Sequence, residues 1–189
     1  MIYLSKGYSA AVNDDGTTTV VCVGKRFVLS AACSEVWYRG VGDFGSVSTP
    51  VETEILNRLS QYGLVCTSKK NTKESGRLLL FNIIPFTSQK DVPIAITDTT
   101  DKALYLLLRN AEIHLLPYEL ACLIDNNYSL PQGICDSENS QDIFSVLEQH
   151  CNCTSNVTSK DIKRMNPSVV SSVCESLLRL QKNNLIYFS

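Results

Sequence analysis

An internal repeat limits the possible folds of this chain more than any other feature of its sequence. Residues 27–29 lead an apolar run into a helical pattern, and residues 113–115 do the same in the second half. Arg-Leu pairs at 58–59 and 179–180 are each followed by four residues and another apolar pair. A repeat marks equivalent structural units, so the sequence predicts two units, unless these apolar patterns coincide by chance.

The elements within each unit follow the order of a winged helix. We therefore predict an α+β fold of two tandem winged-helix-like units, each a β-hairpin plus two or three helices. Pro85 and Pro93 bound a polar stretch that we interpret as a linker. The first unit is predicted to cover residues 1–86 and the second residues 87–189, with the middle helix shortened or missing in the first.

Turn and capping residues define the elements of the first unit. Asn-Asp-Asp-Gly at residues 13–16 predicts a hairpin, because these residues tolerate the backbone angles of tight turns. Ser30 and Thr49, the latter followed by proline, predict helix starts, and Gly63 predicts a helix end. The predicted strands are 8–12, 17–23, 26–29, 64–66 and 78–84, and a polar loop at 68–76 would form the wing.

Apolar runs and their periodicity predict the elements of the second unit. These are strands at 104–108, 113–116 and 185–188, and helices at 117–124, 141–150 and 169–180. In both units the apolar face of each element predicts the core. The predicted core residues are Leu29, Val36, Trp37, Ile55, Leu59, Leu64, Leu115, Leu120, Ile143, Leu147, Val173, Leu177, Leu180 and Ile186.

Composition favours a globular, intracellular protein. Hydrophobic residues make up 44% of the 189 residues, enough to bury a core. The chain begins without the apolar stretch of a secretory signal, and its apolar runs fall short of the roughly 20 residues of a membrane span. We therefore expect a cytoplasmic protein without membrane contact, whose eight cysteines are reduced thiols.

No pattern in the sequence indicates catalysis. Neither His114 nor His150 lies in a catalytic motif, and no phosphate loop, dinucleotide fingerprint or nucleophile elbow is present. His150, Cys151 and Cys153 are soft metal ligands, but zinc sites usually separate paired cysteines by roughly two to four residues. We expect a non-enzymatic protein without metal or cofactor, while metal binding by these three residues stays an alternative.

Basic residues concentrate in the predicted wing loop. Lys69, Lys70, Lys73 and Arg77 stand there against Glu74 alone. A basic loop can lie along a phosphate backbone, although most lysine-rich turns are simply solvated. Because the formal net charge of the chain is −2, nucleic-acid binding would require such a local patch.

The first unit resembles the PqqD-like peptide-recognition domains of peptide-modification pathways. The likeness rests on the hairpin, the strand at 27–30, a helix ending at Trp37 and a helix ending before Gly63, and a similar order returns in residues 113–186. The second unit departs from the pattern, since its helix starts with Pro117 and it has no counterpart of Trp37. Winged-helix transcription regulators share nearly the same skeleton.

This resemblance implies capture of a leader peptide as an added strand on the edge of the hairpin. Unpaired N–H and C=O groups of an edge provide affinity, and pockets for alternate side chains provide specificity. The residues of that predicted edge are Thr19, Val21 and Val23.

Three functions therefore compete. The first is a non-catalytic peptide- or protein-binding adaptor, accessory to a peptide-modification pathway. The second is a winged-helix DNA-binding transcription regulator that uses the basic wing. The third is an enzyme or cysteine-metal protein of a kind that no motif reveals.

Overall fold

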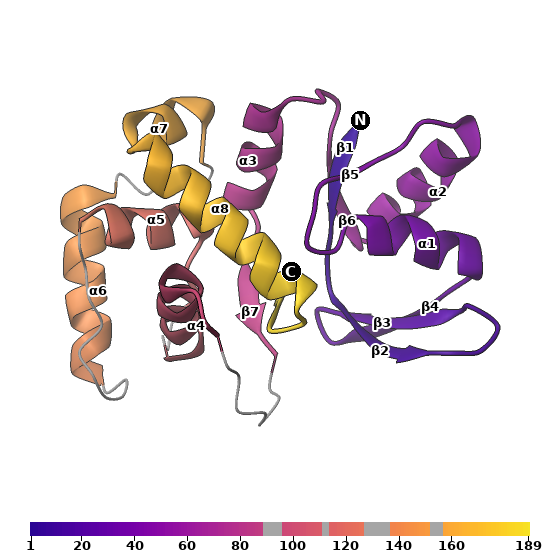
Figure 1. The fold of residues 1–189 in the computed structure, drawn as a ribbon, viewed down its shortest axis with the longest axis horizontal. Helices are drawn as coiled ribbons and strands as arrows, with labels where there is room; N and C mark the ends of the chain where they lie inside the picture. The colour runs from indigo at the N-terminus through magenta and orange to yellow at the C-terminus, as the bar shows by residue number, and fades with distance from the viewer. Residues whose placement is uncertain (89–95, 111–113, 127–136, 152–156) are drawn as a thin grey trace.

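The computed structural model describes residues 1–88, 96–110, 114–126, 137–151 and 157–189. These residues form eight helices and three small antiparallel sheets, which confirms the predicted α+β class. Most strands lie in the first part of the chain and most helices in the second, on opposite sides of the molecule (Figure 1). Two equivalent winged-helix-like units are not seen in this arrangement.

The first sheet has three strands in the order β2-β3-β4 and contains the predicted hairpin. Its strands are β2 (Tyr8–Val12), β3 (Thr18–Cys22) and β4 (Lys25–Leu29). In the first turn the Asn13 amide donates to the Thr17 hydroxyl at 2.8 Å, and Gly16 has a φ of +78°. Val23 and Gly24 both have positive φ in the second turn, as a two-residue hairpin turn requires.

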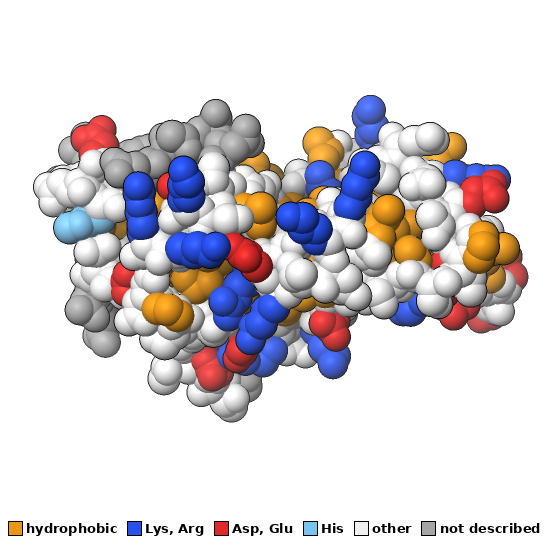
Figure 2. Space-filling view, turned by 90° about the horizontal axis from the view of Figure 1, so that it is seen from above, with side chains coloured by type: hydrophobic (Ala, Val, Ile, Leu, Met, Phe, Trp, Pro, Cys, Tyr) orange, Lys and Arg blue, Asp and Glu red, His pale blue; other side chains and the backbone are white. Residues whose placement is uncertain are grey.

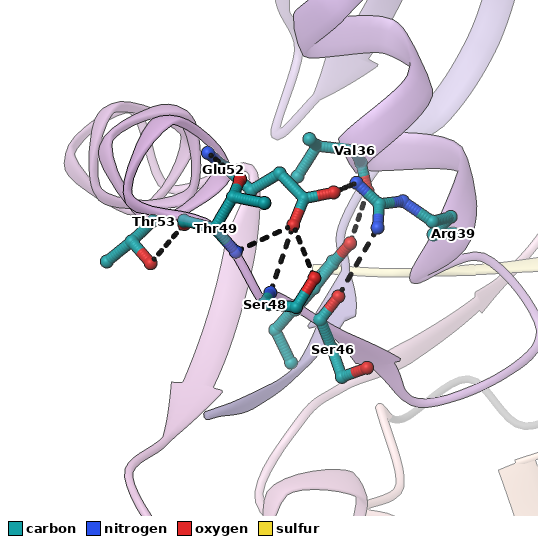
Figure 3. A network of polar contacts seen from close by, with 8 residues as sticks. Val36, Arg39, Ser46, Ser48, Thr49, Glu52 and Thr53 are labelled. Atoms are coloured by element: carbon teal, nitrogen blue, oxygen red, sulfur yellow. Dashed lines mark hydrogen bonds and ion pairs between the residues drawn. The ribbon is translucent and has the colours of Figure 1, made fainter.

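Two capped helices pack against each other beside this sheet. They are α1 (Ala31–Arg39) and α2 (Pro50–Gln61). Ser30 and Thr49 cap them as predicted, and Thr49 forms a reciprocal capping box with Glu52. The Arg39 guanidinium donates to Glu52 Oε1 at 2.6 Å and thereby joins α1 to α2 (Figure 3). Hydrogen bonds from the Ser48 backbone and from Arg39 lower the pKa of the Glu52 carboxyl to about 2.

The second sheet separates two hydrophobic cores. Its order is β5-β1-β6, with β5 (Gly45–Ser46), β1 (Ile2–Ser5) and β6 (Val65–Ser68). Successive side chains of a strand point to opposite faces. Tyr3 accordingly lies in one core and Leu4 in the other, and Val65 and Cys66 divide in the same way. Strand β1 was not predicted, although a short continuous apolar run is typical of a strand buried on both faces.

We name these clusters the first core and the second core. The first core consists of Tyr3, Val20, Cys22, Leu29, Val36, Trp37, Leu56, Leu59, Leu64 and Val65. The second core extends in sequence from Leu4 to Phe188 and is built largely from helices. Every predicted core residue is buried except Ile55, which is half-buried because its neighbour Leu56 takes the inward position on α2.

The remaining elements surround the second core, and α8 runs across the middle of them (Figure 1). They are α3 (Lys73–Phe81), β7 (Pro85–Thr87), α4 (Thr99–Asn110), α5 (Pro117–Asp125), α6 (Ser137–His150), α7 (Ser159–Arg164), α8 (Pro167–Lys182) and β8 (Ile186–Phe188). The helices predicted at 117–124, 141–150 and 169–180 and the strand predicted at 185–188 are confirmed within a few residues.

Three predicted strands are wrong. Residues 78–81 belong to α3, residues 104–108 belong to α4, and residues 114–116, the described part of the third, form no strand. The two helical runs are rich in leucine, which is not branched at Cβ and therefore favours helices over strands. In α4 the fully buried Leu104 and the buried Leu107 lie three residues apart, a helical spacing that the surrounding apolar residues conceal.

Strand β7 pairs with β8 and brings the middle of the chain to its last strand. The register places Pro85 opposite Phe188 and Phe86 opposite Tyr187. Part of the predicted linker is therefore a strand, while residues 89–95 lie outside the described part of the chain. The unit boundary at residue 86 stays a prediction. No described helix is long and apolar enough to cross a membrane.

Candidate peptide-binding cleft

The predicted binding strand is not an edge of its sheet. Strand β3 pairs with β2 through Val21 opposite Tyr8 and with β4 through Thr19 opposite Val28. Thr19 and Val21 therefore lie on the central strand, and Val23 lies in the turn that follows it. Their assignment to an edge is wrong because the sequence predicts three strands here but does not show which of them lies in the middle of the sheet. The edges of this sheet are β2 and β4.

A cleft of about 1030 Å³ opens between the first sheet and the β7-β8 pair. Strand β2 and the end of α1 line one side, and β7, β8, the end of α4 and His114 line the other. A volume of this size lies at the upper end of the range for ligand pockets. The cleft can therefore hold several residues of a peptide.

Strand β2 presents an unpaired edge to this cleft. Its neighbour Gly7 donates from its backbone N–H to the Phe188 carbonyl at 2.7 Å, which forms a single isolated bridge to β8. Backbone N–H groups two residues apart lie on the same side of a strand. The Ser9 N–H therefore points away from β3 as the Gly7 N–H does, but β2 and β8 diverge after the first bridge. Four of the five β2 residues are exposed.

Aromatic rings form a continuous row along the cleft. The Tyr8 and Tyr187 ring centroids lie 5.2 Å apart, and Tyr187 stacks on Phe86 with centroids 5.5 Å apart and an interplanar angle of 13°. The imidazole of His114 also contacts the Phe86 ring, with centroids 4.6 Å apart and an interplanar angle of 53°. Rings in this arrangement offer a large, rigid apolar surface to a ligand.

Helix α1 holds the start of β2 in place. The Trp37 indole N–H donates to the Lys6 carbonyl at 3.1 Å, and the Tyr38 hydroxyl donates to Ser9 Oγ at 2.9 Å. The Trp37 and Tyr38 rings also meet edge to face, with centroids 5.1 Å apart. The position of β2 is therefore fixed by side chains as well as by its pairing with β3.

Gln181 of α8 ties the two sides of the cleft together at its base. Its side-chain amide donates to the Ser5 carbonyl at 3.0 Å, and its side-chain oxygen accepts from the Gly42 N–H at 2.8 Å. Gln181 is buried, and its bond to the Ser5 carbonyl is shielded from water, while the bond from Gly42 is partly buried.

Arg109 is the one formally charged side chain among the described residues that line the cleft. It stands in the last turn of α4 and is exposed to solvent. A guanidinium binds carboxylates through two parallel hydrogen bonds. The cleft is therefore apolar and aromatic along β7 and β8, with a cationic group on its rim.

The four basic residues predicted on a wing lie elsewhere. Lys69 and Lys70 follow β6, and Lys73 and Arg77 belong to α3, so no wing loop carries them. The Arg77 guanidinium donates to the Ser171 hydroxyl of α8. The placement on a wing is wrong because it required a second strand at 78–84, and residues 78–81 belong to helix α3.

The cysteine and histidine residues considered for metal binding are not gathered around a site in the described structure. His150 is exposed, Cys151 is buried, and Cys153 lies outside the described residues. The Cys151 thiol hydrogen-bonds with Cys122 and thereby lowers the pKa of the Cys122 thiol. Within the described ranges no group of three or more metal-ligating side chains occurs.

Comparisons with protein-family models, with curated proteins and with solved structures found no match to this chain. The resemblance to PqqD-like domains therefore stays a prediction that depends on the residues quoted for it.

Sequence reasoning missed most of the cleft. Phe86 lay in the predicted linker and Tyr187 in a predicted strand, and no sequence pattern pairs residues so far apart. The one available signal was strand β2 itself. Its residues, Tyr-Ser-Ala-Ala-Val, include no charged or proline residue, whereas natural edge strands are commonly protected by such residues.

Proposed function

We propose that this protein is a non-catalytic adaptor that binds an extended peptide or protein segment in the cleft, as a strand added to β2. The observation that carries the proposal is the unpaired edge of β2, which lines the cleft beside the row of aromatic rings. Main-chain hydrogen bonds to the edge provide affinity in this binding mode, and pockets for alternate side chains provide specificity.

The two edges of the sheet differ in a way that favours β2. Strand β4 starts with Lys25 and Arg26, charges that discourage pairing with another chain. Strand β2 carries no charge or proline and is interrupted only by a bulge between Ser9 and Ala11. An edge without such protection is prone to unwanted pairing, which argues that a partner normally covers it.

The charge of the rim adds a preference for the ligand. Because Arg109 is the charged group at the cleft, segments that carry Asp or Glu beside apolar or aromatic residues fit it best. Such an adaptor would serve as an accessory protein in a cytoplasmic peptide-modification pathway.

Random peptides displayed on phage test the proposal. We expect selection on the wild-type protein to enrich peptides containing Asp or Glu together with apolar residues. Fluorescence anisotropy of the enriched peptides should show at least a tenfold loss of affinity, about 1.4 kcal/mol, for Ser9→Pro. This substitution removes the N–H that points into the cleft, at an edge position where proline is tolerated.

Two variants serve as matched controls. Ser9→Ala keeps the N–H but removes the hydroxyl that binds Tyr38, and Val28→Pro places proline on the opposite edge of the same sheet. Both should bind the peptides within a few-fold of wild type. Failure of the wild type to enrich any peptide, or equal binding by Ser9→Pro, would refute the proposal.

A further inference from the structure

Two basic segments that are far apart in the sequence meet on one face of the molecule. Helix α3 packs against α7, and the Lys163 ammonium pairs with the Glu74 carboxylate across this contact at 3.0 Å. At the end of α3, the Asn82 side-chain amide donates to the Val157 carbonyl and accepts from the Val157 N–H, just before α7 begins. Residues 69–77 and 159–164 therefore form one continuous surface, which we call the α3–α7 face.

This face is strongly cationic. Its basic residues are Lys69, Lys70, Lys73, Arg77, Lys160, Lys163 and Arg164. Six of the seven are exposed, and Arg77 is half-buried. Figure 2 shows Lys and Arg side chains gathered over α7 and α3 on the side of the molecule seen from above.

The carboxylates of the face are already engaged within it. Glu74 pairs with Lys163, and Asp161 accepts from the N–H and hydroxyl of Thr158 at the start of α7. Glu175 belongs to α8 and lies outside these two segments. The two segments thus carry seven basic side chains and two carboxylates, both of which are already bonded, although the chain as a whole has a net charge of −2. The positive charge is a local feature of this face.

We infer that the α3–α7 face binds the phosphate backbone of a nucleic-acid duplex. Lysines spread over two adjacent segments can neutralise several phosphates at once, and this term dominates sequence-independent binding. Duplex binding here is independent of peptide binding, because no residue of the face lines the cleft.

The composition of the face selects the duplex over two other polyanions. Amphipathic helices that bind membranes insert apolar side chains, and surfaces that bind single strands stack bases on aromatic rings. The exposed large hydrophobic residues of the described chain include none from 69–77 or 159–164. The face would therefore bind through contacts to phosphates, and its affinity would depend little on base sequence.

Binding to a random-sequence DNA duplex at several salt concentrations tests this inference. Two triple variants are compared, Lys69→Gln, Lys70→Gln, Lys73→Gln on one segment and Lys160→Gln, Lys163→Gln, Arg164→Gln on the other. For each phosphate that the protein no longer neutralises, the slope of log affinity against log salt falls by about 0.9. Each triple variant should therefore lower the slope by up to about 2.7 and weaken binding at least tenfold at low salt.

A charge-matched control and two alternative probes complete the test. Lys25→Gln, Arg26→Gln, Lys102→Gln removes three cations from β4 and α4, and should leave duplex binding unchanged. Circular dichroism confirms that each variant is folded. The inference fails if the wild type does not bind the duplex at low salt, if neither segment affects binding, or if single-stranded DNA or phosphatidylserine vesicles bind more tightly than the duplex.

Discussion

The two cores differ in how far apart in the sequence their contacts lie. All residues of the first core and those packed against it fall within residues 1–65. The second core instead requires Leu4 from the first strand, Leu80 from α3 and Phe188 from the last strand. Its polar contacts are equally distant, since Arg179 of α8 binds Asp101 of α4 through two hydrogen bonds. The first core can form from residues 1–65 alone, whereas the second core is complete only when the last strand is in place.

The two cores are nevertheless joined. Strand β1 has one side chain in each core, and Gln181 bonds from α8 to residues beside the first core. A sheet buried on both faces transmits a change in one core to the other, because interiors are densely packed. We therefore expect the cores to unfold together.

The largest effect is expected from removing one buried leucine in each core. Leu56 and Leu177 are both fully buried, so Leu56→Ala and Leu177→Ala should each lower the free energy of unfolding by about 2–5 kcal/mol. Trp37, the single tryptophan, reports on the first core by fluorescence, and circular dichroism reports mainly on the helices. In urea unfolding, Leu177→Ala should shift both signals. A Trp37 transition that stays at its wild-type midpoint would show that the cores are independent.

A smaller effect is expected at Gln181. Replacement by alanine leaves the Ser5 carbonyl and the Gly42 N–H without their partner, at a cost of about 1–3 kcal/mol. Because these bonds join the two sides of the molecule, Gln181→Ala should also separate the Trp37 transition from the helical one. Gln61 is exposed on α2, and Gln61→Ala should change stability by less than about 0.5 kcal/mol. Equal effects of the two substitutions would contradict a joining role for Gln181.

The smallest effect is a pH dependence within the first core's helices. The pKa of Glu52 is about 2 in the folded protein, against an ordinary value of 4.5. Its contribution to stability is therefore present above pH 4.5 and is lost as the pH falls towards 2. We expect Glu52→Gln to be less stable than wild type at pH 7, and this difference to shrink at pH 3. Glu54→Gln, which removes an exposed pair with Arg58, is the control and should show a weaker trend.

Residues 8–66 could be predicted closely because their signals are local. Asn13 and Gly16 specify a turn, and Ser30, Thr49 and Gly63 specify helix ends, whatever lies elsewhere in the chain. In the second half, Pro117 marked one correctly predicted helix, and apolar spacing predicted those at 141–150 and 169–180. The leucine-rich runs at 78–81 and 104–108 belong to helices that begin beside the capping residues Thr72 and Asp98, but burial on several sides hid their helical period.

The cleft could not be predicted for a different reason. Its walls are assembled by pairing β7 with β8 and by the bridge from Gly7 to Phe188. These contacts join residues about a hundred or more positions apart, and no local pattern encodes them. The basic face shows the same limit, because only the fold brings residues 69–77 and 160–164 together.

The position of β1 has a consequence for synthesis of the protein. Its Ser5 carbonyl is bonded by Gln181, which the ribosome adds 176 residues later. At about 5–20 residues per second this interval lasts roughly 9–35 s. The first core can form during that time, but the Ser5 carbonyl of β1 and the Gly7 N–H beside β2 lack their partners until α8 and β8 emerge. Nascent chains are therefore most exposed to mispairing or chaperone capture at their earliest strands.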